Sequence, residues 1–320
     1  MRGMRPRVFA ATMAAAGVIA IGAGCGGGGG GGGATSGGTA NLVATPGISE
    51  QVNKKIAAEV PSSLKSKGTL TVAADATYPP NEFIKPNSNT VIGMDADLAK
   101  MLAQVMGLKA QLKNATFDSI LPGLAAHKFD LGMSSFTVTK EREKEVDFVS
   151  YAIAGTSFYV NASGGPNIGT IADLCGEKVA VERGTIQADQ ATAQSKKCKA
   201  AGKPGVDLSV FPDQNGANLA ISSGRADVGM ADSPPAAYIV EQSNGQFKLT
   251  GKPYGEAVYG IAMAKDSGLA KPVLGAVKQV MSDGTYDKIF KYWGLVKTGP
   301  SGCPCSINNP QINPTNVPPS

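Results

Sequence analysis

The sequence predicts an α/β fold built from two similar halves, each with a largely parallel sheet. Strand-like and helix-like segments alternate from about Gly68 to Gly294. A six-residue pattern (a basic residue, any residue, Asp, an apolar residue, Gly, Met) also occurs twice, at 128–133 and at 225–230, each time after a helix-like segment. Because the strand and turn before it repeat as well, we expect two lobes of similar topology.

The positions of individual helices and strands follow from the periodicity of apolar residues and from the placement of Gly and Pro. Thr69–Ala74 is predicted to be the first strand, and Lys178–Glu182 with its turn at Gly184-Thr185 is the corresponding strand of the second half. Pro122 fits the first turn of a helix in the first half. One helix has an apolar face at i, i+3, i+4, i+7 and i+8, ended by Gly107; the face consists of Leu98, Met101, Leu102, Val105 and Met106.

The N-terminal segment has the features of an export signal over residues 1–24. A basic start precedes an apolar run from Val8 to Ala23, which is shorter than the ~20 residues of a spanning helix, so cleavage is favoured over an uncleaved anchor. Small residues precede Cys25, as in the bacterial lipobox, in which the cysteine is lipidated. Gly22 stands where that motif usually has Leu, Val or Ile, and a shifted alignment uses Ile21 instead. A Gly-rich tether and linker is expected over residues 25–62.

Charge and histidine content exclude several classes of function. Without the basic N-terminal segment, 27 Lys and Arg stand against 25 Asp and Glu, and no basic patch occurs, so a nucleic-acid partner is not expected. His127 is the single histidine. Mechanisms of the Ser-His-Asp, Cys-His and HExxH types are therefore excluded, and no metal or other cofactor is expected.

The remaining cysteines indicate a disulfide, as is usual in an exported chain. Cys175 and Cys198 flank one β–α unit and are the favoured pair. Cys303-Pro-Cys305 is too tight for an unstrained bridge, so its pairing stays open.

Polar side chains gather at the carboxyl ends of the two repeated strands, where α/β proteins bind ligands. Met133 is followed by four hydroxyl side chains within six residues and then by Arg142, and the second strand ends at Asp232. Capping of strand and helix ends is the alternative role for these residues, with Ser233 as an N-cap and Pro234 at the next position. If the two strand ends face each other, however, a cation and hydroxyls lie opposite a carboxylate, which fits a zwitterion.

At these residues the chain strongly resembles the polar amino-acid substrate-binding proteins of bacterial ABC transporters, solute-binding protein family 3. The resemblance rests on motifs that occur in the family's order: Gly68–Val72 with Asp75–Pro80, Gly93–Leu98, Phe117–Pro122, Ser134–Arg142, Gly184-Thr185, Gly224–Asp227 and Asp283–Tyr286. It implies a two-lobed type II periplasmic-binding-protein fold, with two hinge strands that cross near Gly155 and Pro253. Lobe I is expected at 63–156 and 257–297, lobe II at 157–256, and a flexible C-terminal tail at 298–320.

The same resemblance implies the ligand-binding residues. Arg142 is expected to hold the ligand α-carboxylate through two parallel N–H···O bonds, and Asp232 to receive the α-ammonium. The sequence departs from the family at Asn81, where Phe is usual, and at Ile186, where a Thr is frequent. The full set expected to bind the ligand is Asp75, Tyr78, Phe117, Ser134, Ser135, Thr137, Arg142, Thr185, Ile186 and Asp232.

The resemblance implies a monomeric lipoprotein on the outer face of the cytoplasmic membrane. It is expected to capture a polar amino acid by hinge closure and to deliver it to an ABC transporter permease. Polar or basic amino acids are favoured because Asp75 lies beside the pocket aromatics; glutamine-like ligands follow, and acidic ones come last. The alternatives are an exported cyclohexadienyl-dehydratase-like enzyme, with Asp75 or Glu82 as general acid, and a ligand-sensing subunit. Enzymatic activity is not expected, because Arg142 and Asp232 match zwitterion capture.

Overall fold

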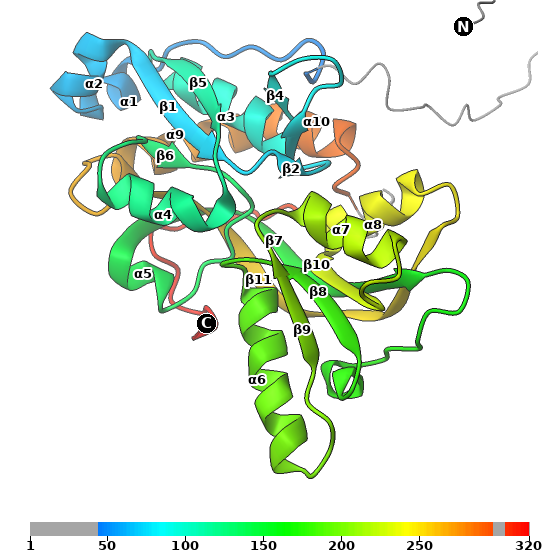
Figure 1. Ribbon diagram of the computed structural model, residues 1–320. Coiled ribbons are helices and arrows are strands. Elements are labelled where there is room, and N and C mark those ends of the chain that lie inside the picture. Colours follow the sequence, from blue (N-terminus) through cyan, green and yellow to red (C-terminus); the bar gives the residue numbers. More distant parts are fainter. Residues whose placement is uncertain (1–43, 297–304, 320) are drawn as a thin grey trace, which may run out of the picture. The chain divides into compact units, whose positions relative to one another are not determined.

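The computed structural model describes residues 44–296 and 305–319 (Figure 1). The predicted signal peptide, Cys25, the glycine run and Cys303 lie outside these residues. No helix within the described ranges is both long enough and apolar enough to cross a membrane.

A central sheet of eight strands has the order β5-β1-β6-β11-β7-β10-β8-β9. A second sheet contains three short strands in the order β2-β3-β4. The strands are β1 (Thr69–Ala74), β2 (Thr77–Tyr78), β3 (Glu82–Ile84), β4 (Val91–Ile92), β5 (Lys109–Asn114), β6 (Leu131–Gly132), β7 (Val146–Asn161), β8 (Lys178–Glu182), β9 (Asp207–Phe211), β10 (Val228–Asp232) and β11 (Phe247–Ala264). The sheet is mixed: β7 and β11 are antiparallel to each other, and a parallel set of three strands flanks each of them.

The two flanking sets have equivalent topology, as the repeated six-residue pattern predicts. In lobe I the amide of Asp130 donates to the carbonyl oxygen of Thr71 in β1, at 2.9 Å. In lobe II the amide of Asp227 donates in the same way to Lys178 in β8, at 2.8 Å. Each pattern then enters a strand that pairs in parallel with the first strand of its lobe. The predicted two-lobed α/β fold is therefore confirmed.

Helices cover the sheet in both lobes (Figure 1). They are α1 (Lys54–Glu59), α2 (Ser62–Lys67), α3 (Met94–Val105), α4 (Phe117–Ala125), α5 (Arg142–Glu145), α6 (Ile186–Ala200), α7 (Gln214–Ser222), α8 (Ser233–Gln242), α9 (Ala270–Ser282) and α10 (Thr285–Tyr292), with a short 3₁₀ helix η2 at Ile171–Leu174. The predicted apolar face of α3 is buried, and Gly107 beyond it takes a φ of +74°. The first-turn position predicted for Pro122 is wrong, because α4 already begins at Phe117 and Pro122 lies inside it, on the exposed side.

β7 and β11 connect the lobes and run side by side over most of their lengths (Figure 1). Their pairing register is irregular between Thr250 and Ala257. Gly155 lies opposite this irregularity, where a Cβ atom would come within 2.8 Å of the Tyr254 carbonyl oxygen. Only glycine permits this approach of the two backbones. The irregularity coincides with the predicted crossings near Gly155 and Pro253, while the lobe boundaries at 156 and 256 stay predictions.

The linker expected over residues 25–62 is ordered in its described part, from residue 44 onward. The amide and hydroxyl of Thr45 both donate to Asp97 Oδ2, at 2.6 and 2.7 Å. The Asn53 side chain caps α1 and also donates to Gln279 Oε1 at 2.7 Å. Residues 44–62 of the expected linker are therefore held in place, because their polar groups bind partners far away in the sequence.

The tail expected to be flexible is also ordered over residues 305–319. In lobe I, β7 pairs with β11 along one edge only, because β10 reaches only residues 156–160 of β7. The C-terminal segment covers the other edge: the amide of Ser150 donates to the Gln311 carbonyl oxygen, and the amide of Asn313 donates to Phe148, both at 2.9 Å. An open strand edge favours such pairing, which explains the order in spite of the Pro-rich composition.

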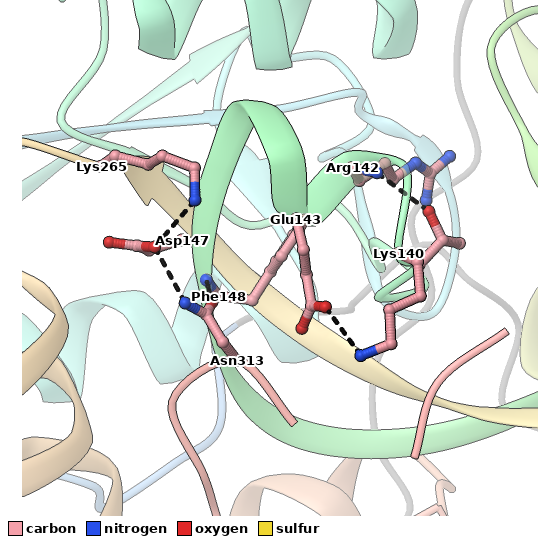
Figure 2. A network of polar contacts seen from close by, with 8 residues as sticks. Lys140, Arg142, Glu143, Asp147, Phe148, Lys265 and Asn313 are labelled. Atoms are coloured by element: carbon pink, nitrogen blue, oxygen red, sulfur yellow. Dashed lines mark hydrogen bonds and ion pairs between the residues drawn. The ribbon is translucent and has the colours of Figure 1, made fainter. Parts of the chain in front are cut away.

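The Asn313 side chain fixes this segment at the start of β7 (Figure 2). Its Oδ1 accepts the amide of Phe148 at 2.8 Å, and its Nδ2 donates to Asp147 Oδ1 at 2.9 Å. Lys265 forms an ion pair with the same carboxylate oxygen, at 3.5 Å. The C-terminal segment is therefore held by side-chain as well as backbone bonds.

The predicted disulfide Cys175–Cys198 is confirmed, with the two Cα atoms 5.6 Å apart. It joins the residue after η2 to the buried face of α6. Cys305 is disulfide-bonded as well.

Candidate functional site

Nine of the ten predicted site residues line one cavity between the lobes. They are Tyr78, Phe117, Ser134, Ser135, Thr137, Arg142, Thr185, Ile186 and Asp232. Gln187, which the sequence analysis missed, also lines this cavity, and Asp75 does not. The structure therefore brings together residues from both repeated strand ends.

The hydroxyl side chains after β6 are positioned by buried groups behind them. Ser134 Oγ accepts the amide of Asp75 at 2.9 Å and donates to Glu82 Oε1 at 3.1 Å. Ser135, which has a φ of +51°, accepts from Asn81 Nδ2 at 2.8 Å and donates to Glu82 Oε2 at 3.2 Å. Asn81, the departure from the family pattern, thus acts on the site through Ser135.

Two buried carboxyl groups lie beneath these hydroxyls. Burial, together with the charge of Asp95, raises the pKa of Glu82 well above its usual range. Burial raises the pKa of Asp95 to about 6, although the nearby Tyr151 hydroxyl and the hydrogen bond from the Ser135 amide oppose the rise. Asp95 lies in the first turn of α3, after the N-cap Gly93, and its Oδ2 accepts the Ser135 amide at 3.0 Å.

Arg142 reaches the cavity from the start of α5. Its Nη1 donates to the Thr137 carbonyl oxygen at 2.7 Å, and its Nη2 donates to the Gly184 carbonyl oxygen of lobe II at 2.9 Å. The guanidinium carbon also lies 5.4 and 5.7 Å from the ring centroids of Phe117 and Phe136, within the range of cation–π attraction. Burial lowers the pKa of Arg142 to about 10, so the group is charged at neutral pH. The remaining N–H donors suit a carboxylate.

Asp232 faces the cavity from lobe II, at the end of β10. Its Oδ1 accepts from Gln187 Nε2 at 2.7 Å, and its Oδ2 accepts from the Tyr259 hydroxyl at 2.8 Å. Burial raises its pKa to about 6, against the opposing effects of these two hydrogen bonds and the Arg142 charge. Asp232 occupies the N-cap position of α8 without a side-chain capping bond. The Asp232 carboxylate therefore does not cap the helix, which was the alternative role for this residue. It can accept a hydrogen bond from an ammonium group.

The start of α6 provides the third side of the cavity. Thr185 caps this helix, with Oγ1 accepting the amide of Ala188 at 3.3 Å. The first amides of a helix have no partner within the helix, so the α6 N-terminus favours an anion. Gln187 links this turn to Asp232 and also donates to Thr156 at 3.0 Å. The sequence indicated Gln187 only through its position directly after the predicted site residue Ile186. Its hydrogen-bond partners Thr156 and Asp232 lie in other strands.

Asp75 is buried next to the cavity and does not form part of its wall. Its Oδ1 accepts from Thr77 Oγ1 at 2.7 Å, and its Oδ2 accepts the amide of Phe117 at 2.9 Å. Burial raises the pKa of Asp75 against these bonds. The carboxyl also interacts with Glu182 of lobe II, a residue that the sequence analysis did not consider as a site residue.

The lobes contact each other at several points around the cavity. Besides the Arg142–Gly184 bond, the amide of Gln214 donates to Thr77 Oγ1 at 3.2 Å. Arg183 forms an ion pair with Asp118 at 3.6 Å. Phe83 of lobe I lies 6.3 Å from the Tyr238 ring of α8 and 5.8 Å from the Trp293 ring. The structure is therefore a closed arrangement of the lobes. Across the described part of the chain, no cluster of His, Cys, Asp or Glu residues could hold a metal ion.

Two lobes that share a pair of hinge strands and close over a polar cavity define a solute-binding protein with the type II periplasmic-binding fold. The chain belongs to the bacterial extracellular solute-binding proteins, family 3, whose family model matches residues 70–296. The family predicted from the sequence is confirmed.

Relatives and solved structures agree with this assignment. The arginine-binding protein ArgT of Corynebacterium glutamicum is 33% identical over 242 residues, which cover 75% of this chain and 79% of ArgT. An ancestral arginine-binding protein bound to arginine superposes with a TM-score of 0.64 at 36% identity, covering 71% of this chain and 98% of its own. The ancestral amino acid-binding protein AncCDT-1, a precursor of cyclohexadienyl dehydratase, has a TM-score of 0.65 at 34% identity, covering 72% and 97%.

Proposed function

We propose that this protein captures a free amino acid by its zwitterionic head group. The observation that carries the proposal is that Arg142 of lobe I and Asp232 of lobe II line the same cavity from opposite sides. Arg142 holds the α-carboxylate together with the α6 N-terminus, and Asp232 receives the α-ammonium. Ser134, Ser135 and Thr137 contribute hydroxyl and backbone contacts, and Tyr78 and Phe117 flank the ligand side chain. The printed names of the relatives, which bind amino acids, support this proposal.

The closed lobes then deliver the ligand to the permease of an ABC transporter. Hinge closure of this kind is a known motion of periplasmic binding proteins. The Arg142–Gly184 bond supports the link between binding and closure, because the residue that holds the carboxylate also bonds the opposite lobe. Reconstitution tests this step: the liganded protein should stimulate ATP hydrolysis by its permease, and the ligand alone should not.

A screen for thermal shifts tests the binding function directly. A ligand at one hundred times its dissociation constant stabilises the folded state by about 2.7 kcal/mol, which raises the melting temperature. Each of the twenty amino acids should be tested against residues 44–320. At least one should raise the melting temperature of the wild type, and this shift should be clearly smaller in Arg142→Ala. If none of the twenty stabilises the protein, the proposed function is wrong.

We also propose that the exported monomer is held at the outer face of the membrane by a lipid on Cys25. The small residues before Cys25 and the glycine run after it support this placement. Cys25→Ala should release the protein from membranes into the medium and lower its mass by that of the lipid. A variant that stays with the membranes at unchanged mass contradicts the lipid anchor.

Enzymatic activity is not part of the proposal, although AncCDT-1 is a precursor of a dehydratase. Glu82 is fully buried, and both of its oxygens accept from serine hydroxyls. Neither Glu82 nor Asp75 lines the cavity in which Arg142 and Asp232 are proposed to hold the head group. Turnover of a cyclohexadienyl carboxylate by the purified protein would contradict the absence of enzymatic activity from this proposal. The other alternative, a ligand-sensing subunit, would require a signalling partner.

A further inference from the structure

Glu182, at the carboxyl end of β8, is a buried acid to which the head-group site gives no role. Only 1% of the residue is exposed. In the part of the chain that the structure describes, no N–H or hydroxyl donor reaches either of its carboxyl oxygens, and its direct polar neighbour is the carboxyl group of Asp75. The side-chain oxygen of Gln214 is also buried and unpartnered. Gln214 follows β9, the strand that pairs with β8, so three unsatisfied acceptor atoms belong to one end of lobe II.

Lobe I places a second acid against this end. Asp75 directly follows β1, and Glu182 is the last residue of β8, the equivalent strand of the other lobe. The two carboxyl groups interact directly, and neither can donate to the other while both are ionised. Thr77 connects the lobes here, because its hydroxyl donates to Asp75 and accepts the amide of Gln214. The acidic pair thus forms only when the lobes close.

The charged groups that interact with Glu182 do not balance the negative charge of its ionised form. The strongest charge interactions of Glu182 are with the acids Asp75, Asp213 and Asp232. Tyr78 and Tyr159 also face it, as neutral phenols. Arg183, the next residue, is directed to an ion pair with Asp118 instead. Without a ligand, Glu182 keeps its proton, which it can share with the Asp75 carboxylate. The ionised form requires a cation or hydrogen-bond donors instead, and a bound molecule can supply these.

We propose that Glu182, with Asp75 and the Gln214 side-chain oxygen, forms a subsite for a cationic ligand side chain, so that the ligand is a basic amino acid. This inference rests on the proposed function, which places the ligand head group between Arg142 and Asp232. Tyr78 connects the two parts of the site, since it lines the cavity and interacts with both Asp232 and Glu182. A guanidinium suits the subsite better than an ammonium, because its five N–H groups in one plane match several separate acceptors.

Arginine and citrulline test the subsite, since citrulline has nearly the same shape as arginine and no side-chain charge. Calorimetry on the wild type should show arginine binding about 30-fold to a few thousand-fold more tightly than citrulline, and lysine in between. Glu182→Gln keeps the size of the side chain and removes its charge. This variant should lower the arginine-to-citrulline ratio to below about 10-fold while leaving citrulline affinity nearly unchanged. Glu241→Gln, an exposed acid on α8 of the same lobe, is the matched control and should keep the wild-type ratio.

The number of protons bound gives a second readout. Burial raises the pKa of Glu182 to about 10, so next to a neutral side chain the carboxyl keeps its proton at neutral pH. A bound cation favours the ionised form. The citrulline complex should therefore hold about one proton more than the arginine complex at pH 7, measured by calorimetry in buffers of different ionisation enthalpy. Glu182→Gln should abolish this difference.

The outcomes separate the subsite from the head-group site. Equal affinity for arginine and citrulline in the wild type overturns the subsite, as does an unchanged ratio in a folded Glu182→Gln variant. In both cases amino-acid binding still stands. If Glu182→Gln does not fold, the affinity ratio and the proton difference of the wild type decide the question. If neither arginine, citrulline nor any other amino acid binds, the proposed function itself fails.

Discussion

The guanidinium of Arg142 donates to the carbonyl oxygen of Gly184 across the lobe interface, at 2.9 Å. A second bond, to Thr137, anchors the same group within lobe I. The two bonds use only part of the donor capacity of the guanidinium, so a ligand carboxylate can share it. Recognition of the carboxylate and contact between the lobes therefore depend on one side chain.

Arg142→Ala should weaken binding of the native amino acid by about 30-fold to a few thousand-fold, because a buried carboxylate loses its partner, at ~2–5 kcal/mol. The melting temperature of the ligand-free protein should change little. Arg142→Lys keeps the charge but cannot form two parallel bonds, so it should remain clearly weaker than wild type. Full affinity of the lysine variant, measured by calorimetry, contradicts the proposed role of the guanidinium.

The affinity should depend on pH through Asp232. Its pKa of about 6 lies above the ordinary value, and a bound ammonium lowers it by favouring the ionised form. Affinity should thus be constant above about pH 7 and fall as the pH drops through 6, because binding then has to remove a proton. The Asp232→Asn variant should bind the amino acid weakly, and its affinity should no longer depend on pH in this range. An analogue of the ligand without the α-amine should bind the variant and the wild type with similar affinity. A wild-type affinity that stays flat down to pH 5 would refute the assignment.

Glu82 should limit stability at high pH. Its pKa is raised in the folded state, so the folded protein holds a proton that the unfolded chain loses above about pH 4.3. The free energy of unfolding contributed by this group therefore falls as the pH rises from that value. Glu82→Gln removes the titration, and its stability relative to wild type should increase between pH 5 and pH 9 in denaturant unfolding. A constant difference across this range would show that Glu82 is not the titrating group.

The Cys175–Cys198 bond should stabilise the fold by about 3 kcal/mol, as expected for a loop closed over a sequence separation of 23. Denaturant unfolding of the Cys175→Ser/Cys198→Ser double variant measures this loss. Peptide mapping of the wild type without reduction should recover the linked pair. Alkylation of both cysteines under non-reducing conditions would contradict it.

Asn313→Ala should lower the free energy of unfolding by about 1–3 kcal/mol, because the amide of Phe148 and the carboxylate of Asp147 lose a partner. Ligand affinity should hardly change. Asn309→Ala, at an exposed position of the same segment, is the control and should be nearly neutral. If the two variants are equally stable, the C-terminal segment does not contribute through Asn313.

The sequence was sufficient for the fold and most of the site because both depend on local patterns. The repeated six-residue pattern placed Ser134 and Asp232 at the carboxyl ends of equivalent strands, one in each lobe, and α/β proteins bind ligands at such ends. The buried face of α3 followed from helical spacing alone. The position of Arg142 after the hydroxyl side chains indicated a cation near that strand end, and its expected role came from the family resemblance.

The errors concern residues whose partners are distant in the sequence. Thr45 binds Asp97, and Asn313 binds Asp147, so segments with linker-like composition are ordered. Glu182 was treated only as the last residue of a strand, since nothing near it in the sequence indicates that Asp75 approaches it from the other lobe. The contact between Asp75 and Glu182 depends on how the two lobes close, and the periodicity of the sequence carries no information about closure.

Trp293 is the only tryptophan of the chain, and its position gives the protein a built-in optical reporter. Its indole N–H donates to Asp97 Oδ2 at 3.0 Å, so the fluorophore is held rigidly in lobe I. Phe83 lies between it and Tyr238 of lobe II, so we expect the distance between Tyr238 and the indole to increase when the lobes open. Energy transfer from Tyr238 to the indole depends steeply on their separation. The emission of unlabelled protein can therefore follow opening and closing in real time, in a stopped-flow instrument, without any engineered dye.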